Sequence, residues 1–268
     1  MLKQKKNNFS KARQIYLKNV KKNKFWVIFW RIALFLIFLG IWELLSSVGV
    51  LDPFFFSSPS RICSCIGALA SQNNLWIHIW TSLYETIIGF LLASAIGFVI
   101  AVALWWSENL RKVLEPYLVI LNSLPKIALG PMIIFWVGSG TGATIVMCVL
   151  ICVIITIIST LNAFISCDKD KILLMKSMHA SKAQIFFKLV LPSALPDFVS
   201  VLKINVGMSW VGTIMGEYLS SQAGLGYLIN YGSQILKLDI VMTSIVLLCA
   251  LAGGMYLLVG IFEKRVKK

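Results

Sequence analysis

The sequence predicts an all-α, polytopic membrane protein with six transmembrane helices and one further helix on the cytoplasmic side. Of its 268 residues, 58% are hydrophobic and only 13% are charged, whereas a soluble domain carries about 25% charged residues. The apolar residues form long runs, and a hydrocarbon core needs about 20 of them per helix. Because unpaired backbone groups are costly in lipid, and the runs do not alternate with polar residues, we expect helices and not a barrel.

The six spans follow the apolar runs, which cover residues 26–45, 83–106, 116–137, 143–165, 199–219 and 240–262. Residues 46–82, between the first two spans, are polar and are expected to be irregular. The glycine-rich stretch at 138–143 matches G-x-G-x-x-[GA], but it lies between two spans, so we interpret it as a turn and not as a dinucleotide site. Small residues such as Gly89, Gly97 and Gly212 predict close helix packing.

The basic residues indicate how the spans are oriented. Twenty of the 25 lysines and arginines fall in residues 1–25, 107–115, 167–198 and 264–268, and only Arg61 and Lys237 fall in the opposite loops. Positive charge gathers on the cytoplasmic side of membrane proteins, so both termini are expected in the cytoplasm. A net charge of +14 placed this way points to lipid and not to nucleic acid. The predicted organisation is a basic segment at 1–25, a transmembrane domain at 26–263 and a basic tail at 264–268.

Ionisable residues within spans are costly and mark candidate pathways. Lys126 interrupts the third span and Glu217 lies near the outer end of the fifth; a helix break and an interface position are the plain alternatives. The candidate pathway residues are Asn122, Pro125, Lys126, Trp210 and Glu217. Glu85 is expected to be solvated at the outer end of the second span, and Lys203 to extend to the inner surface.

No feature of the sequence points to chemistry on this chain. The six cysteines and two histidines form no cluster with metal-ligand spacing, so we expect neither a metal nor a cofactor. His78 and His179 fall on opposite sides, which argues against a membrane-embedded enzyme. A G-x-x-x-x-G-K-[ST] phosphate loop is absent from the sequence.

The loop at 167–198 carries the clearest functional signal. Its middle, residues 175–190, is predicted to form one amphipathic helix, ended by Pro192. One side would carry Met175, Met178, Ala183, Phe186 and Phe187, flanked by Lys176, Lys182 and Lys188. Such a helix suits docking in a groove of another protein or lying on lipid, and physical argument leaves both open.

This loop resembles the Glu-Ala-Ala loop of ABC importer permeases. Leu189 and Leu191-Pro192 match the end of that motif at its spacing. Three other segments are also similar to permeases of the nitrate/sulfonate/taurine/bicarbonate type; these segments are residues 56–61, 124–131 and 223–229. The likeness as a whole covers residues 26–263. The motif's Glu-Ala-Ala falls on 173–175 and its glycine on His179, so the negative charge and the tight turn are expected to be absent.

The resemblance implies a permease subunit and not an enzyme, in the plasma membrane of a bacterium. Its partners would be a cytoplasmic ABC ATPase dimer, a second permease copy and an extracytoplasmic solute-binding protein. The implied ATPase-coupling residues are Lys176, Met178, His179, Ala180, Ser181, Lys182, Phe186, Phe187, Lys188, Leu191 and Pro192. The implied cargo is a small oxyanion or organosulfonate, or alternatively a vitamin or pyrimidine precursor. An ion-coupled secondary transporter is the competing class, and it would need more charges in mid-span than Lys126.

Overall fold

The computed structural model describes residues 11–71 and 74–266, and all regular structure in these ranges is helical. The predicted all-α class is therefore confirmed. Residues 1–10 of the predicted basic segment and 267–268 of the predicted tail lie outside the described ranges. The chain forms two compact units, one ending at Cys63 and one starting at Ser64.

The first unit is dominated by α1 (Lys11–Ser47), which runs from the basic segment through the first predicted span. The apolar window within Lys22–Ser47 has no buried residues inside the chain, as suits a helix surrounded by lipid. α2 (Pro53–Phe56) and α3 (Pro59–Ser71) follow.

The expectation that residues 46–82 are irregular is wrong, because side-chain caps start helices there. Asp52 accepts a hydrogen bond from the Phe54 amide at 2.8 Å, with Pro53 in the first helical turn. At the start of α3, the Glu43 carboxylate accepts hydrogen bonds from the Ser60 amide at 3.0 Å and hydroxyl at 2.7 Å. This carboxylate comes from α1, so no local window around Ser60 reveals the cap.

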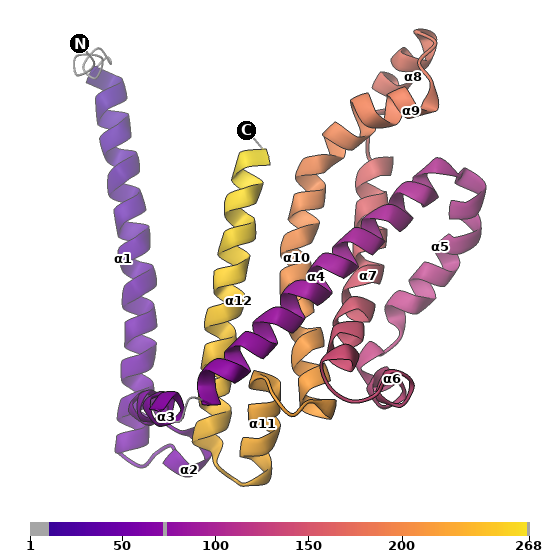
Figure 1. Ribbon diagram of the computed structural model, residues 1–268. Coiled ribbons are helices and arrows are strands. Elements are labelled where there is room, and N and C mark those ends of the chain that lie inside the picture. Colours follow the sequence, from indigo (N-terminus) through magenta and orange to yellow (C-terminus); the bar gives the residue numbers. More distant parts are fainter. Residues whose placement is uncertain (1–10, 72–73, 267–268) are drawn as a thin grey trace. The chain divides into compact units, whose positions relative to one another are not determined.

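The second unit has four long helices and several short ones (Figure 1). The long helices are α4 (Asn74–Trp106), α7 (Thr141–Ile165), α10 (Leu191–Ser220) and α12 (Leu238–Val266). The short elements are α5 (Glu108–Ser123), η1 (Lys126–Leu129), α6 (Gly130–Val137), α8 (Lys169–Ser177), α9 (Lys182–Ile185), η2 (Phe186–Val190) and α11 (Leu225–Gln234). α8, α9 and the last turns of α4 and α12 lie at one end of this unit, and α6 and α11 lie at the other (Figure 1).

α7 packs closely along both α4 and α10. Gly89 and Gly97 of α4 and Gly212 and Gly216 of α10 face it, and a Cβ atom at Gly212 would lie 2.6 Å from the Cα atom of Cys148. Only glycine permits such an approach of two helix backbones. The predicted packing through small residues is confirmed at these positions.

Five described helices are long and apolar enough to cross a membrane, and a sixth span is formed if a bent pair is counted. The bent pair is Glu108–Ser123 and Lys126–Val137, which meet at 84°. This break falls where the third predicted span is interrupted. Leu124 is extended (φ −64°, ψ 137°), as expected for a residue before proline.

Candidate functional site

The segment after α7 is two helices and not the single helix predicted over 175–190. α8 ends at Ser177, and the chain then turns at His179, whose φ is +56°. This left-handed conformation is uncommon outside glycine but is more frequent for histidine than for most residues. The tight turn expected to be lost with the motif's glycine is therefore present, with His179 in the glycine's place.

α9 begins at a capping box and continues without a break into α10. The Ser181 hydroxyl accepts from the Gln184 amide at 3.3 Å, and the Gln184 side chain accepts from the Ser181 amide at 2.8 Å. The helix then passes through a π-helical turn at Phe186–Val190. The prediction that Pro192 ends the helix is wrong: Pro192 lies in the first turn of α10, after a turn in which the Leu191 amide donates to the Phe186 carbonyl. Such a wide turn accommodates a proline that lacks an amide hydrogen.

The predicted apolar side of this helix is divided between the core and the surface. Phe186 is only 2% exposed and contacts the rings of Trp105, Trp106 and Phe164, with centroid distances of 4.8, 6.1 and 5.5 Å. Its neighbour Phe187 is 63% exposed. Phe186 thus anchors the segment, because it buries a large side chain among aromatic rings.

The three flanking lysines also differ in their surroundings. The Lys182 ammonium donates to the carbonyl oxygen of Trp106 at 2.5 Å and lies 5.7 Å from the centroid of the Trp105 ring. Trp106 is the last residue of α4, where helix carbonyls carry partial negative charge. Lys182 therefore fixes the segment to α4, while Lys176 and Lys188 are exposed.

An exposed apolar surface remains on this segment, and we call it the α8–α9 surface. It consists of Leu173, Leu174, Met178 and Phe187. Leu173 and Leu174 fall on the Glu-Ala positions of the motif and are not among the predicted coupling residues; two adjacent leucines in a polar loop are the signal that could have identified them. Of the other predicted coupling residues, His179, Ser181 and Pro192 are exposed and Ala180 and Leu191 are half-buried.

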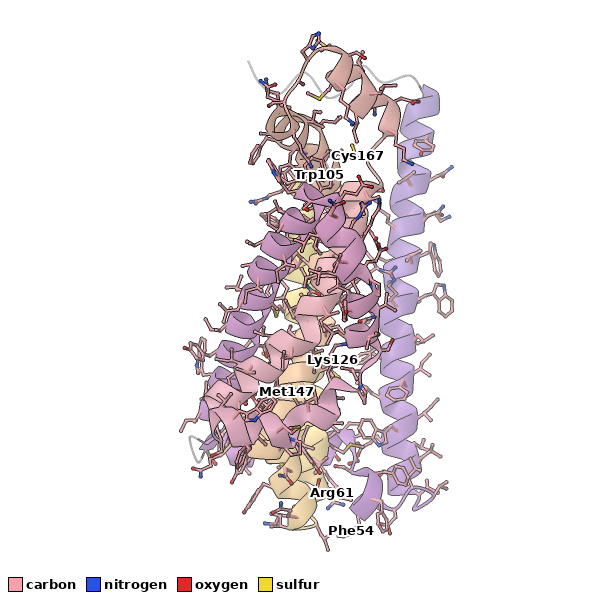
Figure 2. The ribbon with its side chains drawn as sticks, turned by 90° about the vertical axis from the view of Figure 1, so that its right-hand side faces the viewer. Phe54, Arg61, Trp105, Lys126, Met147 and Cys167 are labelled. Carbon is pink, nitrogen blue, oxygen red and sulfur yellow. The ribbon has the colours of Figure 1, made fainter. Side chains whose placement is uncertain are left out.

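The break in the third span forms a second surface. Asn122 and Pro125 are exposed and Lys126 is half-buried. The Lys126 ammonium donates to the Asn122 carbonyl oxygen at 3.1 Å, and no carboxylate pairs with it among the described residues. Figure 2 places Lys126 away from Trp105 and Cys167, which lie toward the end that carries α8 and α9.

The other two pathway candidates lie inside the helix bundle. Trp210 is 3% exposed, and its indole nitrogen has no hydrogen-bond partner in the part of the chain that the structure describes. Glu217 is fully buried and accepts hydrogen bonds from the Ser82 hydroxyl and the Gly226 amide, both at 2.6 Å. The expectation that Glu85 is solvated is wrong, because it is fully buried as well. Lys203, expected to extend to the inner surface, forms an ion pair with Glu263 of α12.

Several curated proteins are similar to this chain over most of its length. A probable ABC transporter permease protein of Haemophilus influenzae is 29% identical over 82% of this chain and 89% of that protein. The taurine transport system permease protein TauC of Escherichia coli is 24% identical over 81% of this chain and 80% of that protein. The formylaminopyrimidine transport permease protein ThiX of Halalkalibacterium halodurans is 30% identical over 72% of this chain and 76% of that protein.

Solved transporters share the fold. A chain of the methionine ABC transporter MetNI in an inward-facing conformation matches with a TM-score of 0.64 and 23% identity, over 72% of this chain and 96% of that chain. A chain of a bacterial alginate ABC transporter in complex with an alginate-bound periplasmic protein also gives 0.64, at 14% identity, over 94% of this chain and 98% of that chain.

A family model agrees with these similarities. The family described as "Binding-protein-dependent transport system inner membrane component" matches residues 93–268, which include both surfaces. The chain belongs to this family of ABC transporter permease subunits, multi-pass proteins of the plasma membrane in which ATP hydrolysis resides in a separate subunit.

Proposed function

We propose that this chain forms the membrane pathway for ATP-driven uptake of a small solute, and that the solute is an oxyanion or organosulfonate delivered by an external binding protein. The observation that carries the proposal is the α8–α9 surface, which presents apolar side chains beside lysines on a segment anchored in the core. The relative named for taurine transport supports the cargo class.

The α8–α9 surface is proposed to dock in a cleft of a cytoplasmic ABC ATPase dimer. Leu173, Leu174, Met178 and Phe187 expose large apolar side chains there, and a helical segment with apolar residues suits a groove on a partner. The Lys176 and Lys188 ammonium groups lie on the same segment and suit acidic residues around such a groove.

The structure of this segment suits the transmission of force. Phe186 fixes it to α4 and α7, and α9 continues through η2 into α10 without a loop. α10 has 30 residues and is therefore about 45 Å long. A displacement of α9 by an ATPase would reach the far end of α10 as a movement of one packed body, which is how helix bundles rock between two openings.

The break in the third span is proposed to line the pathway or the contact with a second permease copy. A lysine and an irregular backbone are both costly against lipid, yet Asn122, Pro125 and Lys126 lie at the surface of the single chain. A homodimer would cover this surface and leave a polar route between the copies. Trp210 and Glu217 are buried in the helix bundle, and their role in the pathway stays a prediction.

Uptake by the complete transporter tests this function. The chain is reconstituted in liposomes together with its ATPase and its solute-binding protein. ATP-dependent accumulation of taurine or another alkanesulfonate is expected. Accumulation of a formylaminopyrimidine instead would favour the pyrimidine-precursor alternative, which the ThiX similarity supports, and uptake driven by an ion gradient without ATP would indicate a secondary transporter.

A charge reversal at the docking surface tests the coupling role. Lys188→Glu is expected to leave the protein membrane-inserted but to uncouple ATP hydrolysis from uptake, and Arg265→Glu at the end of α12 is the matched control. Unchanged uptake in Lys188→Glu would contradict the docking site.

Accessibility labelling checks the orientation: both termini and residues 175–190 are expected on the cytoplasmic side, and external labelling of 175–190 would overturn the proposal.

A further inference from the structure

An open groove lies along one face of α1, where the first predicted span begins. It has a volume of about 490 Å³, and the residues that line it are Trp26, Val27, Trp30, Arg31 and Leu34. These positions share one face of the helix, because they follow the i, i+4, i+8 spacing. All of the lining that the structure describes comes from α1, so this face is a candidate surface for a partner.

Arg31 gives the groove a positive charge. Its side chain is exposed, and no carboxylate pairs with it among the described residues. It lies seven residues after Lys24, which is about 10 Å further along the helix axis. A guanidinium group stays protonated in proteins, and an unpaired cation within the apolar run is costly in hydrocarbon. An anionic partner at this level would remove that cost.

The geometry of the helix indicates where the guanidinium group meets this partner. Side chains of an α-helix lean toward its N-terminus, and arginine extends its charged group toward the nearer membrane interface. The Arg31 side chain is therefore expected to reach toward the turn that carries Trp26. Trp26 stacks with Trp30, with ring centroids 6.5 Å apart, and tryptophan rings prefer the level of the lipid headgroups. The cation and the two rings thus share one depth in the membrane.

The rest of this face is apolar. Leu34, Phe38 and Ile41 continue it at helical spacing, and all three side chains are exposed. Lys22 and Lys24, at the other end of the face, are exposed as well and lie outside the apolar run. The face therefore has positive charge at one end and only apolar side chains beyond it. A phospholipid, in which an anionic group is joined to apolar chains, has the complementary order.

A second copy of α1 fits this face less well. The acidic residue of α1 is Glu43, twelve residues from Arg31 and therefore about 18 Å away along the helix. A parallel copy would not bring that carboxylate to the level of Arg31. The Glu43 carboxylate also accepts hydrogen bonds from the Ser60 amide and hydroxyl. Charge complementarity therefore favours a lipid phosphate over a second α1.

We propose that this face of α1 binds one anionic phospholipid, with the phosphate on Arg31 and an acyl chain along Leu34 and Phe38. The guanidinium group can donate two parallel hydrogen bonds to phosphate oxygens. Lys22 and Lys24 attract a headgroup that carries net negative charge. The lipid belongs to the leaflet that meets the amino-terminal end of the span. This inference goes beyond the proposed import function and does not depend on the cargo.

Native mass spectrometry of the full-length permease, titrated in detergent micelles with phosphatidylglycerol, tests the site. Arg31→Gln is expected to weaken the binding of this lipid about tenfold, because the charge-assisted hydrogen bonds to the phosphate are lost. Arg265→Gln removes an exposed arginine at the end of α12 and is the matched control, with binding as in the wild type. Phosphatidylethanolamine, which has the phosphate but no net charge, is expected to bind the wild type more weakly.

Three results of this titration would overturn the proposal. One is equal affinity of Arg31→Gln and Arg265→Gln for phosphatidylglycerol. Another is equal binding of the two lipids to the wild type, which would remove the preference for an anionic headgroup. The third is a wild-type dimer that Arg31→Gln abolishes, because a second copy would then be the occupant.

Photocrosslinking of the wild-type protein tests the site without any substitution, so the proposal stays testable even if Arg31→Gln fails to insert. The permease is placed in nanodiscs with a phosphatidylglycerol that carries a diazirine beside its glycerol group. Attachment is expected within residues 26–34, and excess unlabelled phosphatidylglycerol should suppress it more than phosphatidylethanolamine does. Attachment confined to other parts of the chain, or equal suppression by both lipids, would overturn the proposal.

Discussion

The two ends of the second unit hold their short helices by different forces. At one end, α9 is fixed by Phe186 among the rings of Trp105, Trp106 and Phe164. At the other, α11 is fixed by hydrogen bonds that the amides of Gly224, Leu225 and Gly226 donate to His78, Ser82 and Glu217, respectively. Apolar burial is large but not directional, whereas buried hydrogen bonds are directional and costly to leave incomplete. The stability of the end that carries α9 should therefore depend on the volume of the buried side chains. The stability of the end that carries α11 should depend on whether the donor and acceptor atoms are kept.

The largest expected effect is at the aromatic anchor. Phe186→Ala should lower the free energy of unfolding by about 3–5 kcal/mol, because it leaves a cavity in the core. Phe187→Ala, one residue along and exposed, should change it by less than about 0.5 kcal/mol. Unfolding of both variants in detergent micelles measures the difference, and similar losses would show that Phe186 is not the anchor.

A smaller loss in the free energy of unfolding is expected at the end of the second unit that carries α11. Ser82→Ala removes a donor to Glu217 and the acceptor of the Leu225 amide, and should cost about 1–3 kcal/mol. Ser94→Ala is the matched control, since Ser94 is buried on the same helix and its hydroxyl has no partner among the described residues. Hydrogen exchange should show faster exchange of the Leu225 and Gly226 amides in Ser82→Ala only. Unaltered exchange would mean that packing alone holds α11.

Lys182, at the start of α9, should contribute less to the free energy of unfolding than Phe186 or Ser82. Lys182→Met removes the bond to the Trp106 carbonyl and the contact with the Trp105 ring, for a loss of about 1 kcal/mol. Because this side chain is exposed to solvent, the loss should shrink at high salt. Lys188→Met should be neutral for stability, because the Lys188 side chain is exposed. A loss in Lys182→Met that salt does not change would assign the effect to packing of the side-chain stem.

The smallest effect is expected at the turn between α8 and α9. His179→Gly removes the cost of a left-handed side chain but makes the unfolded chain more flexible, so stability should change by less than about 0.5 kcal/mol. Lys176→Gly, inside the last turn of α8, should cost about 1 kcal/mol. The same unfolding measurement separates them, and a large loss in His179→Gly would indicate a side-chain contact of His179.

The sequence was sufficient for features that depend on neighbouring residues. Long apolar runs predicted the fold class, and the interruption at Pro125 predicted the break of the third span. The same local reasoning failed where the deciding partner is remote. Glu85 is predicted to be solvated because it lies near a span end in the sequence, whereas it is fully buried in the folded chain.

The candidate site shows the same difference between features that neighbouring residues determine and features that they do not. The segment at 167–198 is predicted to contain one helix over 175–190, whereas the structure has two helices there, separated at His179. A left-handed residue at 179 and a π-helical turn at Phe186–Val190 change the phase of the helix, so Phe186 and Phe187 fall on opposite sides of the boundary between core and surface. Neither feature has a strong signal in residue type, since histidine replaces the expected glycine and proline falls just after the wide turn.

The capping of α11 by other helices has a consequence for how the protein is made. α4 and α10, which supply His78, Ser82 and Glu217, both precede Gly224 in the chain. By the time the ribosome has released residues 224–226, the groups that receive their amides have already been synthesised. The start of α11 can thus be completed by helices made before it, and a nascent chain halted before Leu225 should leave Glu217 open to water-soluble reagents.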